Sequence, residues 1–265
     1  NISGTEGLVA CGNIFLGMTE SPVLIKNYLP TMNRSELFLV MVSGMGTIAG
    51  SVMGSYVGML GGQDPIAQQM FATHLLSASV MAVPGSIVIA KIMCPQTEPI
   101  QKDSKAEWGD EGHSNVLGAI SSGTVTGVKL MTNIAAMLLV FISLIAMVNY
   151  FTNNVIGQYT GLNEWIVKMT DGKSDGLTFQ FILGVITAPF MWLIGVPSDD
   201  IMLVGSLLGQ KTILNEFVAY FQLQEWRDAG LFVSQKSVIM STYILCGFAN
   251  ISSIGILLGG LGVLA

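Results

Sequence analysis

Two acidic residues, Glu20 and Glu216, lie inside long apolar stretches of the sequence. Glu20 is part of the segment GMTESP, and Glu216 is part of the segment NEFVAY. An ionisable side chain at membrane depth costs roughly 2.5–3.5 kcal/mol on insertion scales, so it marks a functional site by default. We therefore expect two buried acids that face a polar solute or ion. The alternative is a structural ion pair with a nearby lysine, Lys26 or Lys211.

The composition is that of a membrane protein. Hydrophobic residues make up 51% of the chain and charged residues only 11%, whereas soluble proteins carry about 25% charged residues. A helix needs about 20 residues to cross the ~30 Å hydrocarbon core. Five stretches without Asp, Glu, Lys or Arg meet this length: 37–60, 71–90, 130–150, 178–196 and 237–265. We predict an all-α polytopic membrane protein.

The order of apolar and polar segments occurs twice. Residues 1–36 contain two short apolar arms around the first acid, which predicts a re-entrant helical hairpin, and 37–60 follows as a glycine-interrupted helix. A second hairpin is predicted within 179–227, with its polar tip around Glu216, before the glycine-interrupted segment 237–265. Two such hairpins with two broken transmembrane helices indicate a transporter built from an inverted repeat, with its binding site near the midplane.

These segments predict three parts of the chain. Residues 1–91 form a first transport-domain repeat with the first hairpin and two helices. Residues 92–176 form a polar loop and a scaffold helix, and residues 177–265 form the second transport-domain repeat. Because the sequence starts without Met in an amphipathic run and ends in an apolar run, we expect a fragment that lacks segments at both ends.

Neutral polar side chains near the breaks could complete a binding site. Broken helices leave backbone carbonyls unpaired, and these can ligate a hard cation such as sodium. Asn13 and Thr47 could add oxygens to such a site, although an asparagine like Asn13, taken alone, is more often a helix-packing or capping residue. Asn250 and Ser253 share one helical face because they are three residues apart. They could bind a polyhydroxylated solute, or hydrogen-bond between helices.

Signs of catalysis and of nucleic-acid binding are missing from the sequence. It contains no HExxH motif, no GxSxG motif with triad partners, and no phosphate-binding glycine loop before Lys-Ser/Thr. The two histidines and three cysteines show no metal-ligand spacing. The net charge of −6 argues against nucleic-acid binding. We therefore do not expect an enzyme or a resident cofactor.

Five segments resemble the concentrative nucleoside transporter family. They are GNIFLGMTESPVLIKNYLP (12–30), SELF and GTIAGSV (within 35–52), ATHLLSASVMAVPGSIVIAK (72–91), NEFVAY (215–220) and CGFANISSIGILLGGL (246–261). The resemblance covers nearly the whole chain. It implies a bacterial sodium/nucleoside cotransporter that imports uridine-like nucleosides by an elevator-type mechanism. It also implies a homotrimer that crosses the inner (plasma) membrane several times, and a fragment that lacks amino-terminal helices and the last carboxyl-terminal helix.

The resemblance also implies roles for individual residues. The nucleobase would face the first hairpin and the first broken helix, at Met18, Thr19, Glu20 and Val52. The ribose would face the second hairpin and the second broken helix, at Glu216, Phe248, Asn250 and Ser253. Sodium would bind the side chain of Asn13, the carbonyls of Leu16 and Ile48, and the hydroxyl and carbonyl of Thr47.

Two points of selectivity stay open. Many members of the family have Gln immediately before the Thr-Glu pair, where this chain has Met18, whose thioether is only a weak acceptor; the choice between purines and pyrimidines is therefore undecided. The alternative function is a carrier for another small polar or anionic metabolite on a similar repeat architecture. It predicts a cationic side chain in the tips or broken helices. None lies within 12–22 or 246–254, although Lys211 is near the second tip.

Overall fold

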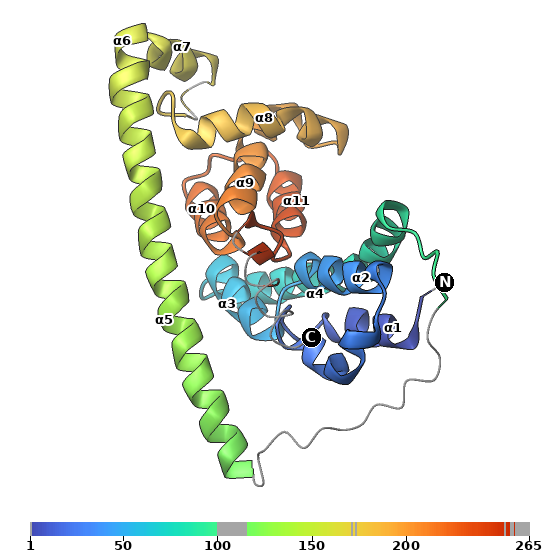
Figure 1. Cartoon of the computed structure of the whole chain (residues 1–265). Helices are drawn as coiled ribbons and strands as arrows, with labels where there is room; N and C mark the ends of the chain where they lie inside the picture. The colour runs from blue at the N-terminus through green and yellow to red at the C-terminus, as the bar shows by residue number, and fades with distance from the viewer. Residues whose placement is uncertain are drawn as a thin grey trace. The chain divides into compact units, whose positions relative to one another are not determined.

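The computed structural model describes residues 2–99, 116–170, 172, 174–251, 253–254 and 257. Every regular element in these residues is helical (Figure 1), which confirms the predicted all-α class. The chain divides into two compact units. The first unit comprises Asn1–Ala106 together with Leu183–Ala265, and the second comprises Glu107–Ile182.

The first unit starts with two short helices joined by a tip. α1 (Gly4–Gly12) and the 3-10 helix η1 (Ser21–Thr31) pack against each other. The Ser21 hydroxyl donates a hydrogen bond to the Val9 carbonyl at 3.0 Å, which fixes the two arms side by side. This is the segment for which the sequence predicts a hairpin, and its re-entry into a membrane stays a prediction.

The first broken helix consists of α2 (Arg34–Gly46) and α3 (Gly50–Gly61). Between them Thr47 has extended backbone angles (φ −121°, ψ 170°), and so does Ala49 (φ −65°, ψ 144°). The interruption therefore falls in the glycine-rich part of the predicted 37–60 segment. α4 (Pro65–Met93) follows and packs against both halves of the broken helix.

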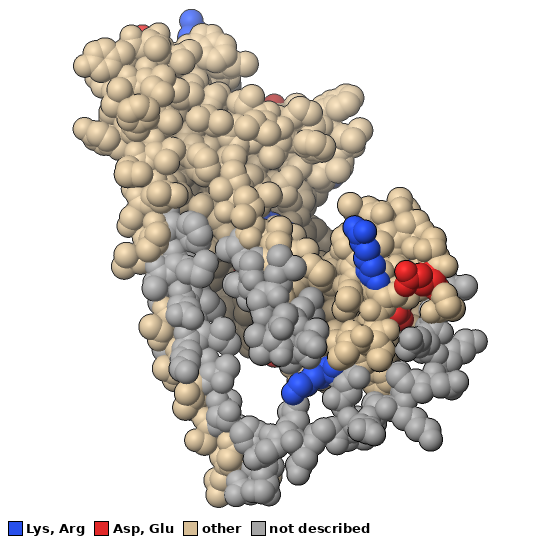
Figure 2. Space-filling view, viewed as in Figure 1, with Lys and Arg blue, Asp and Glu red and all other residues tan. Residues whose placement is uncertain are grey.

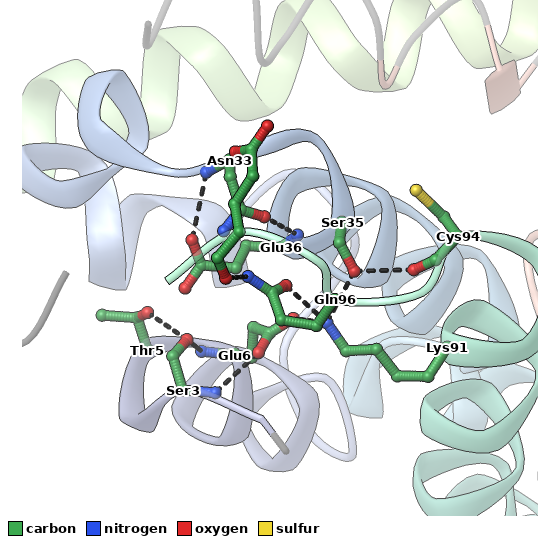
Figure 3. A network of polar contacts seen from close by, with 10 residues as sticks. Ser3, Thr5, Glu6, Asn33, Ser35, Glu36, Lys91, Cys94 and Gln96 are labelled. Carbon is green, nitrogen blue, oxygen red and sulfur yellow. Dashed lines mark hydrogen bonds and ion pairs between the residues drawn. The ribbon is translucent and has the colours of Figure 1, made fainter. Parts of the chain in front are cut away.

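A buried polar network joins the start of α1 to α2 and α4 (Figure 3). The ammonium of Lys91 lies 2.5 Å from Glu6 Oε1 and donates to the Ser35 hydroxyl at 2.9 Å. Ser35 in turn donates to the Cys94 carbonyl at 2.7 Å. The Glu6 side chain is 0% exposed and that of Lys91 16% exposed. Glu6 also accepts from the amide of Ser3, as part of the capping box that starts α1.

The second half of this unit has the same order of elements. The 3-10 turn η3 (Ser198–Asp200) leads into α9 (Ile201–Ile213), and α10 (Glu216–Asp228) packs back against α9. α11 (Gln235–Leu245) then ends at Cys246, where the backbone becomes extended. A helix, a tip, a second helix and an interrupted helix thus occur twice. The two-fold inverted relation between the halves stays a prediction.

The second unit is built around one long helix. α5 (Val116–Asn149) starts at Val116 rather than near residue 130, so the helix is longer than the apolar stretch that predicted it. A π-helical segment, η2 (Tyr150–Gly157), leads to α6 (Gln158–Thr160) and α7 (Leu162–Met169). The Asn149 side chain then bonds the start of α8 (Phe179–Leu193), accepting from the Phe179 amide at 2.7 Å.

Among the described residues, two helical stretches are long and apolar enough to cross a membrane. They are Arg34–Gly61 and Pro65–Met93, and α8 is a shorter apolar helix. Large apolar side chains are exposed along α4, among them Ile66, Met81 and Ile92. Among the described residues, few charged side chains are visible on the face shown in Figure 2. Exposed apolar side chains such as those along α4 are typical of contact with lipid or with another protein.

Candidate functional site

The tip of the first hairpin lies against the first helix break. The amide of Gly50, the first residue of α3, donates to the Phe15 carbonyl at 2.9 Å. Met18 lies against Gly44 of α2, where an added Cβ would come within 3.1 Å of the Met18 Cβ. Glycine at position 44 therefore allows this close approach between the tip and α2.

Asn13 has the features expected of a cation ligand. It caps the end of α1, is 0% exposed, and its Nδ2 donates to the Ser43 hydroxyl at 3.0 Å. Its Oδ1 is buried and has no hydrogen-bond partner in the described part of the chain. A buried acceptor without a partner costs about 1–3 kcal/mol. A bound cation would remove that cost.

The other predicted sodium ligands differ in burial. Thr47 is buried, and its hydroxyl donates to the Ser43 carbonyl at 3.3 Å, which leaves the oxygen lone pairs available. Ile48 is also buried, whereas the Leu16 side chain lies at the surface. Among the described residues no three His, Cys, Asp or Glu side chains form a group that could hold a metal ion. A cation here would therefore bind to neutral oxygens, which suit a hard ion such as sodium.

Glu216 is the centre of a second polar cluster. It starts α10 and is 7% exposed. Its Oε2 accepts from the Asn250 side-chain amide at 3.0 Å, and its Oε1 accepts from the Tyr56 hydroxyl at 3.3 Å. The side-chain oxygen of Asn250, Oδ1, accepts from the Ser253 backbone amide at 2.7 Å. The structure thus brings together Glu216, Asn250 and Ser253, three of the residues assigned to the ribose side.

Tyr56 also belongs to this cluster, although it was not among the residues predicted from the sequence. It is fully buried on α3 and stacks on Tyr220, with ring centroids 4.2 Å apart. Val52 lies one helical turn earlier, on the same face, and packs against the same apolar cluster as Phe248. The spacing of four residues from Val52 was a signal in the sequence, but a tyrosine in an apolar helix is more often a packing residue.

The two helix breaks, at residues 47–49 and 246–250, are in contact. The Phe248 amide donates to the Thr47 carbonyl at 3.3 Å. Gly247 has a φ of +131°, and an added Cβ would lie 2.8 Å from the Gly46 carbonyl oxygen. Tyr56 is six residues after Gly50, about 9 Å along the helix axis. The first tip and the Glu216 carboxylate are therefore attached to the two ends of one short segment of α3.

Glu20 differs from the expectation of two buried acids. Its side chain is exposed, and Thr19 is half-buried. The Glu20 carboxylate folds over Gly17, where an added Cβ would lie 2.1 Å from Oε2. The physical reason is the length of the tip, which runs from Asn13 to Glu20 before η1 starts. The second tip has only two residues, so Glu216 is held inside the fold.

Comparisons with known proteins identify the family. A family profile described as "Na+ dependent nucleoside transporter C-terminus" matches residues 74–265. The chain belongs to this family. Its relatives are transporters and not enzymes, and members of this family are membrane proteins. The predicted resemblance is confirmed.

The sequence relatives include animal and bacterial transporters. Human solute carrier family 28 member 3 is 38% identical to this chain. The matched region comprises 99% of this chain and 37% of the human protein. The sodium/nucleoside cotransporter 1 of Sus scrofa is 38% identical over 98% of this chain, which covers 39% of it. The uncharacterized transporter YutK of Bacillus subtilis is 42% identical over 99% of this chain, which covers 59% of it.

A solved structure shows the same fold. The structure of CNTnw in an inward-facing substrate-bound state is 38% identical, with a TM-score of 0.82, and the match covers 99% of this chain and 57% of that one. The chain thus spans little more than half of this structural neighbour.

Proposed function

We propose that the full-length protein is a secondary active transporter that imports nucleosides together with sodium. The observation that carries the proposal is the contact between the two helix breaks. It connects the oxygens around Asn13 and Thr47 with the buried cluster of Glu216 and Asn250. A cation and a polar solute bound on either side of this contact would be coupled through one piece of backbone.

Glu216 would hold the ribose. A carboxylate has about four lone-pair sites, and the Tyr56 and Asn250 donors use two of them. Ribose hydroxyls could donate to the others, in charge-assisted bonds worth roughly 1.5–3 kcal/mol each. Ser253 and Phe248 would complete this side.

Sodium would organise the nucleobase side. Its ligands would be the side chains of Asn13 and Thr47 and the carbonyls of Leu16, Thr47 and Ile48. These atoms belong to the first tip and the first break, so the ion would fix the position of one against the other. The nucleobase would then face the same two segments, at Met18, Thr19, Glu20 and Val52.

Transport would use an elevator-type movement. Solved CNTnw chains are described as inward-facing, outward-facing and intermediate states, which supports alternating access in this family. In this chain residues 1–91 and 177–265 would form the moving transport domain, and 92–176 would belong to the scaffold. The protein would be a homotrimer in the bacterial inner membrane, with lipid around its apolar helices.

The test is uptake of radiolabelled uridine into proteoliposomes that contain the full-length protein. We expect uptake in sodium and loss of uptake when choline replaces sodium at fixed pH. Glu216→Ala should weaken uridine binding by about 2–4 kcal/mol, because it removes the acceptor and leaves its partners unpaired. The control is Glu225→Ala, which changes an exposed glutamate on the same helix. Unchanged uptake kinetics in Glu216→Ala would contradict the assignment.

A further inference from the structure

Lys211 is a buried cation beside the second tip. It lies in the last turn of α9 and is 6% exposed. Its ammonium donates to the Ile244 carbonyl at 2.9 Å. Ile244 belongs to the last turn of α11, where carbonyls lack intrahelical partners and the helix dipole is negative. The Glu216 carboxylate begins α10 on the other side of the two-residue tip.

Lys211 and Asn13 stand at corresponding places in the two halves. Both lie near the tip end of the first arm: Asn13 is the C-cap of α1, and Lys211 lies in the last turn of α9, two residues before its end. Asn13 bonds Ser43, and Lys211 bonds Ile244. Ser43 and Ile244 each lie three residues before the glycine of their own helix break. The candidate sodium ligand of the first half therefore has a lysine as its counterpart in the second half.

We propose that Lys211 is a resident cation that occupies, in the second half, the position sodium takes in the first. This inference rests on the proposed sodium-coupled transport. The carboxyl end of an interrupted helix attracts a monovalent cation. The Lys211 ammonium can serve as that cation, and because it is covalently attached to the chain it does not exchange with solution. The transporter would then move with one mobile sodium per cycle, bound at the Asn13 side.

The energetics of burial favour this role. An ammonium inside a membrane domain is costly unless oxygens compensate for the lost water. Lys211 finds compensation in the Ile244 carbonyl, and the Glu216 carboxylate follows only a few residues later, at the start of α10. A neutral side chain at position 211 would leave the end of α11 without its cation and Glu216 without a neighbouring positive charge. Both effects would favour the binding of a cation from solution at the place that the Lys211 ammonium now occupies.

The first test is the sodium dependence of nucleoside uptake by Lys211→Asn, which places the same residue type in both halves. We expect uptake to persist at high sodium, with half-maximal sodium raised several-fold and the Hill coefficient rising from about 1 to about 2. Lys211→Arg keeps the charge and should keep a coefficient of about 1. The matched control is Lys236→Asn. Lys236 is exposed, and its ammonium also donates a hydrogen bond to a backbone carbonyl, that of Gly195.

The second test measures sodium binding without transport. The melting temperature of purified full-length protein is followed while sodium replaces choline. Lys211→Asn should show a larger sodium-dependent rise than the wild type and Lys236→Asn. If the wild type shows no sodium-dependent uptake, the proposed function fails, and the difference in melting still decides the role of Lys211.

Two results would overturn the inference. One is a folded Lys211→Asn variant whose Hill coefficient and sodium-dependent melting match the wild type. The other is a Lys211→Asn variant that gives no folded protein even in high sodium, because a missing resident cation should be replaceable by sodium. Either result would assign Lys211 to packing alone.

Discussion

The backbone amide of Phe248 donates a hydrogen bond to the carbonyl of Thr47, at 3.3 Å. Both residues lie where a helix is interrupted, so both backbones have polar groups that no helix satisfies. Thr47 belongs to the candidate sodium site, and Phe248 lies two residues before Asn250, which bonds Glu216. A ligand that fixes the backbone of one break must therefore change the free energy of ligand binding at the other break, and this coupling is reciprocal.

Gly247→Ala tests the contact between the breaks. An added Cβ would meet the Gly46 carbonyl oxygen at 2.8 Å, and the φ of +131° is one that residues with side chains rarely adopt. We expect the two breaks to separate, with loss of both sodium-dependent uptake and uridine binding. Uptake kinetics and binding isotherms on purified protein would measure the loss.

Gly230→Ala is the matched control. Gly230 also has a positive φ, +69°, but nothing lies within 4 Å of an added Cβ. It should lower stability by only about 1–2 kcal/mol and leave the sodium dependence unchanged. An equal loss of uptake in both variants would mean that backbone strain alone, and not the contact, explains the effect.

Tyr56→Phe isolates the hydroxyl that donates to Glu216. The ring and its stacking on Tyr220 stay, and only the 3.3 Å hydrogen bond is removed. We expect uridine affinity to fall about fivefold, since a typical hydrogen bond contributes about 1 kcal/mol net. Binding isotherms at saturating sodium provide the measurement. Tyr159→Phe, at an exposed position in the other unit, should leave affinity unchanged.

Much of this architecture can be predicted from the sequence because its signals are local. The glycine-rich interruption of 37–60 predicts the break at Thr47, and the i, i+3 spacing predicts that Asn250 and Ser253 lie together. Helix ends are harder to predict. The apolar run 178–196 predicts a longer helix than α8, which ends at Leu193 because Gly195 turns the chain with a φ of +83°.

Contacts between distant segments could not be predicted in this way. No local pattern indicates that the Tyr56 hydroxyl reaches Glu216, which is 160 residues away. The exposure of Glu20 depends on the length of the first tip, whereas the burial of Glu216 depends on a two-residue tip packed against α3 and α11. In the sequence, Glu20 and Glu216 both lie in apolar stretches, so the sequence does not distinguish the exposed carboxylate from the buried one.

Thr47→Ala tests the cation side of the site. It removes one neutral oxygen from the candidate sodium ligands while the backbone carbonyl stays. We expect the sodium concentration for half-maximal uptake to rise several-fold, with little change in the maximal rate. Thr132→Ala is a close control, because both hydroxyls donate to the carbonyl four residues earlier in their own helix. A loss of uptake that high sodium cannot restore would indicate damage to folding instead.

Lys91→Met tests the buried network at the start of α1. The Glu6 side chain is fully buried, so removing its partner leaves an uncompensated charge inside the fold (Figure 3). Breaking a buried ion pair in this way costs about 3–5 kcal/mol, and the melting temperature in detergent should fall accordingly. Asp228→Asn, which removes the half-exposed partner of Arg227, should cost less than about 1 kcal/mol.

The double variant Glu6→Gln with Lys91→Met separates charge from packing in this network. With both charges gone, the neutral amide side chain introduced at position 6 can still accept from the Ser3 amide that Glu6 now bonds. Most of the lost stability should therefore return, because replacing both members of a buried pair is far cheaper than removing one. A double variant that melts no higher than Lys91→Met would show that the packing of the lysine side chain, and not the stranded carboxylate, holds α1 against α4.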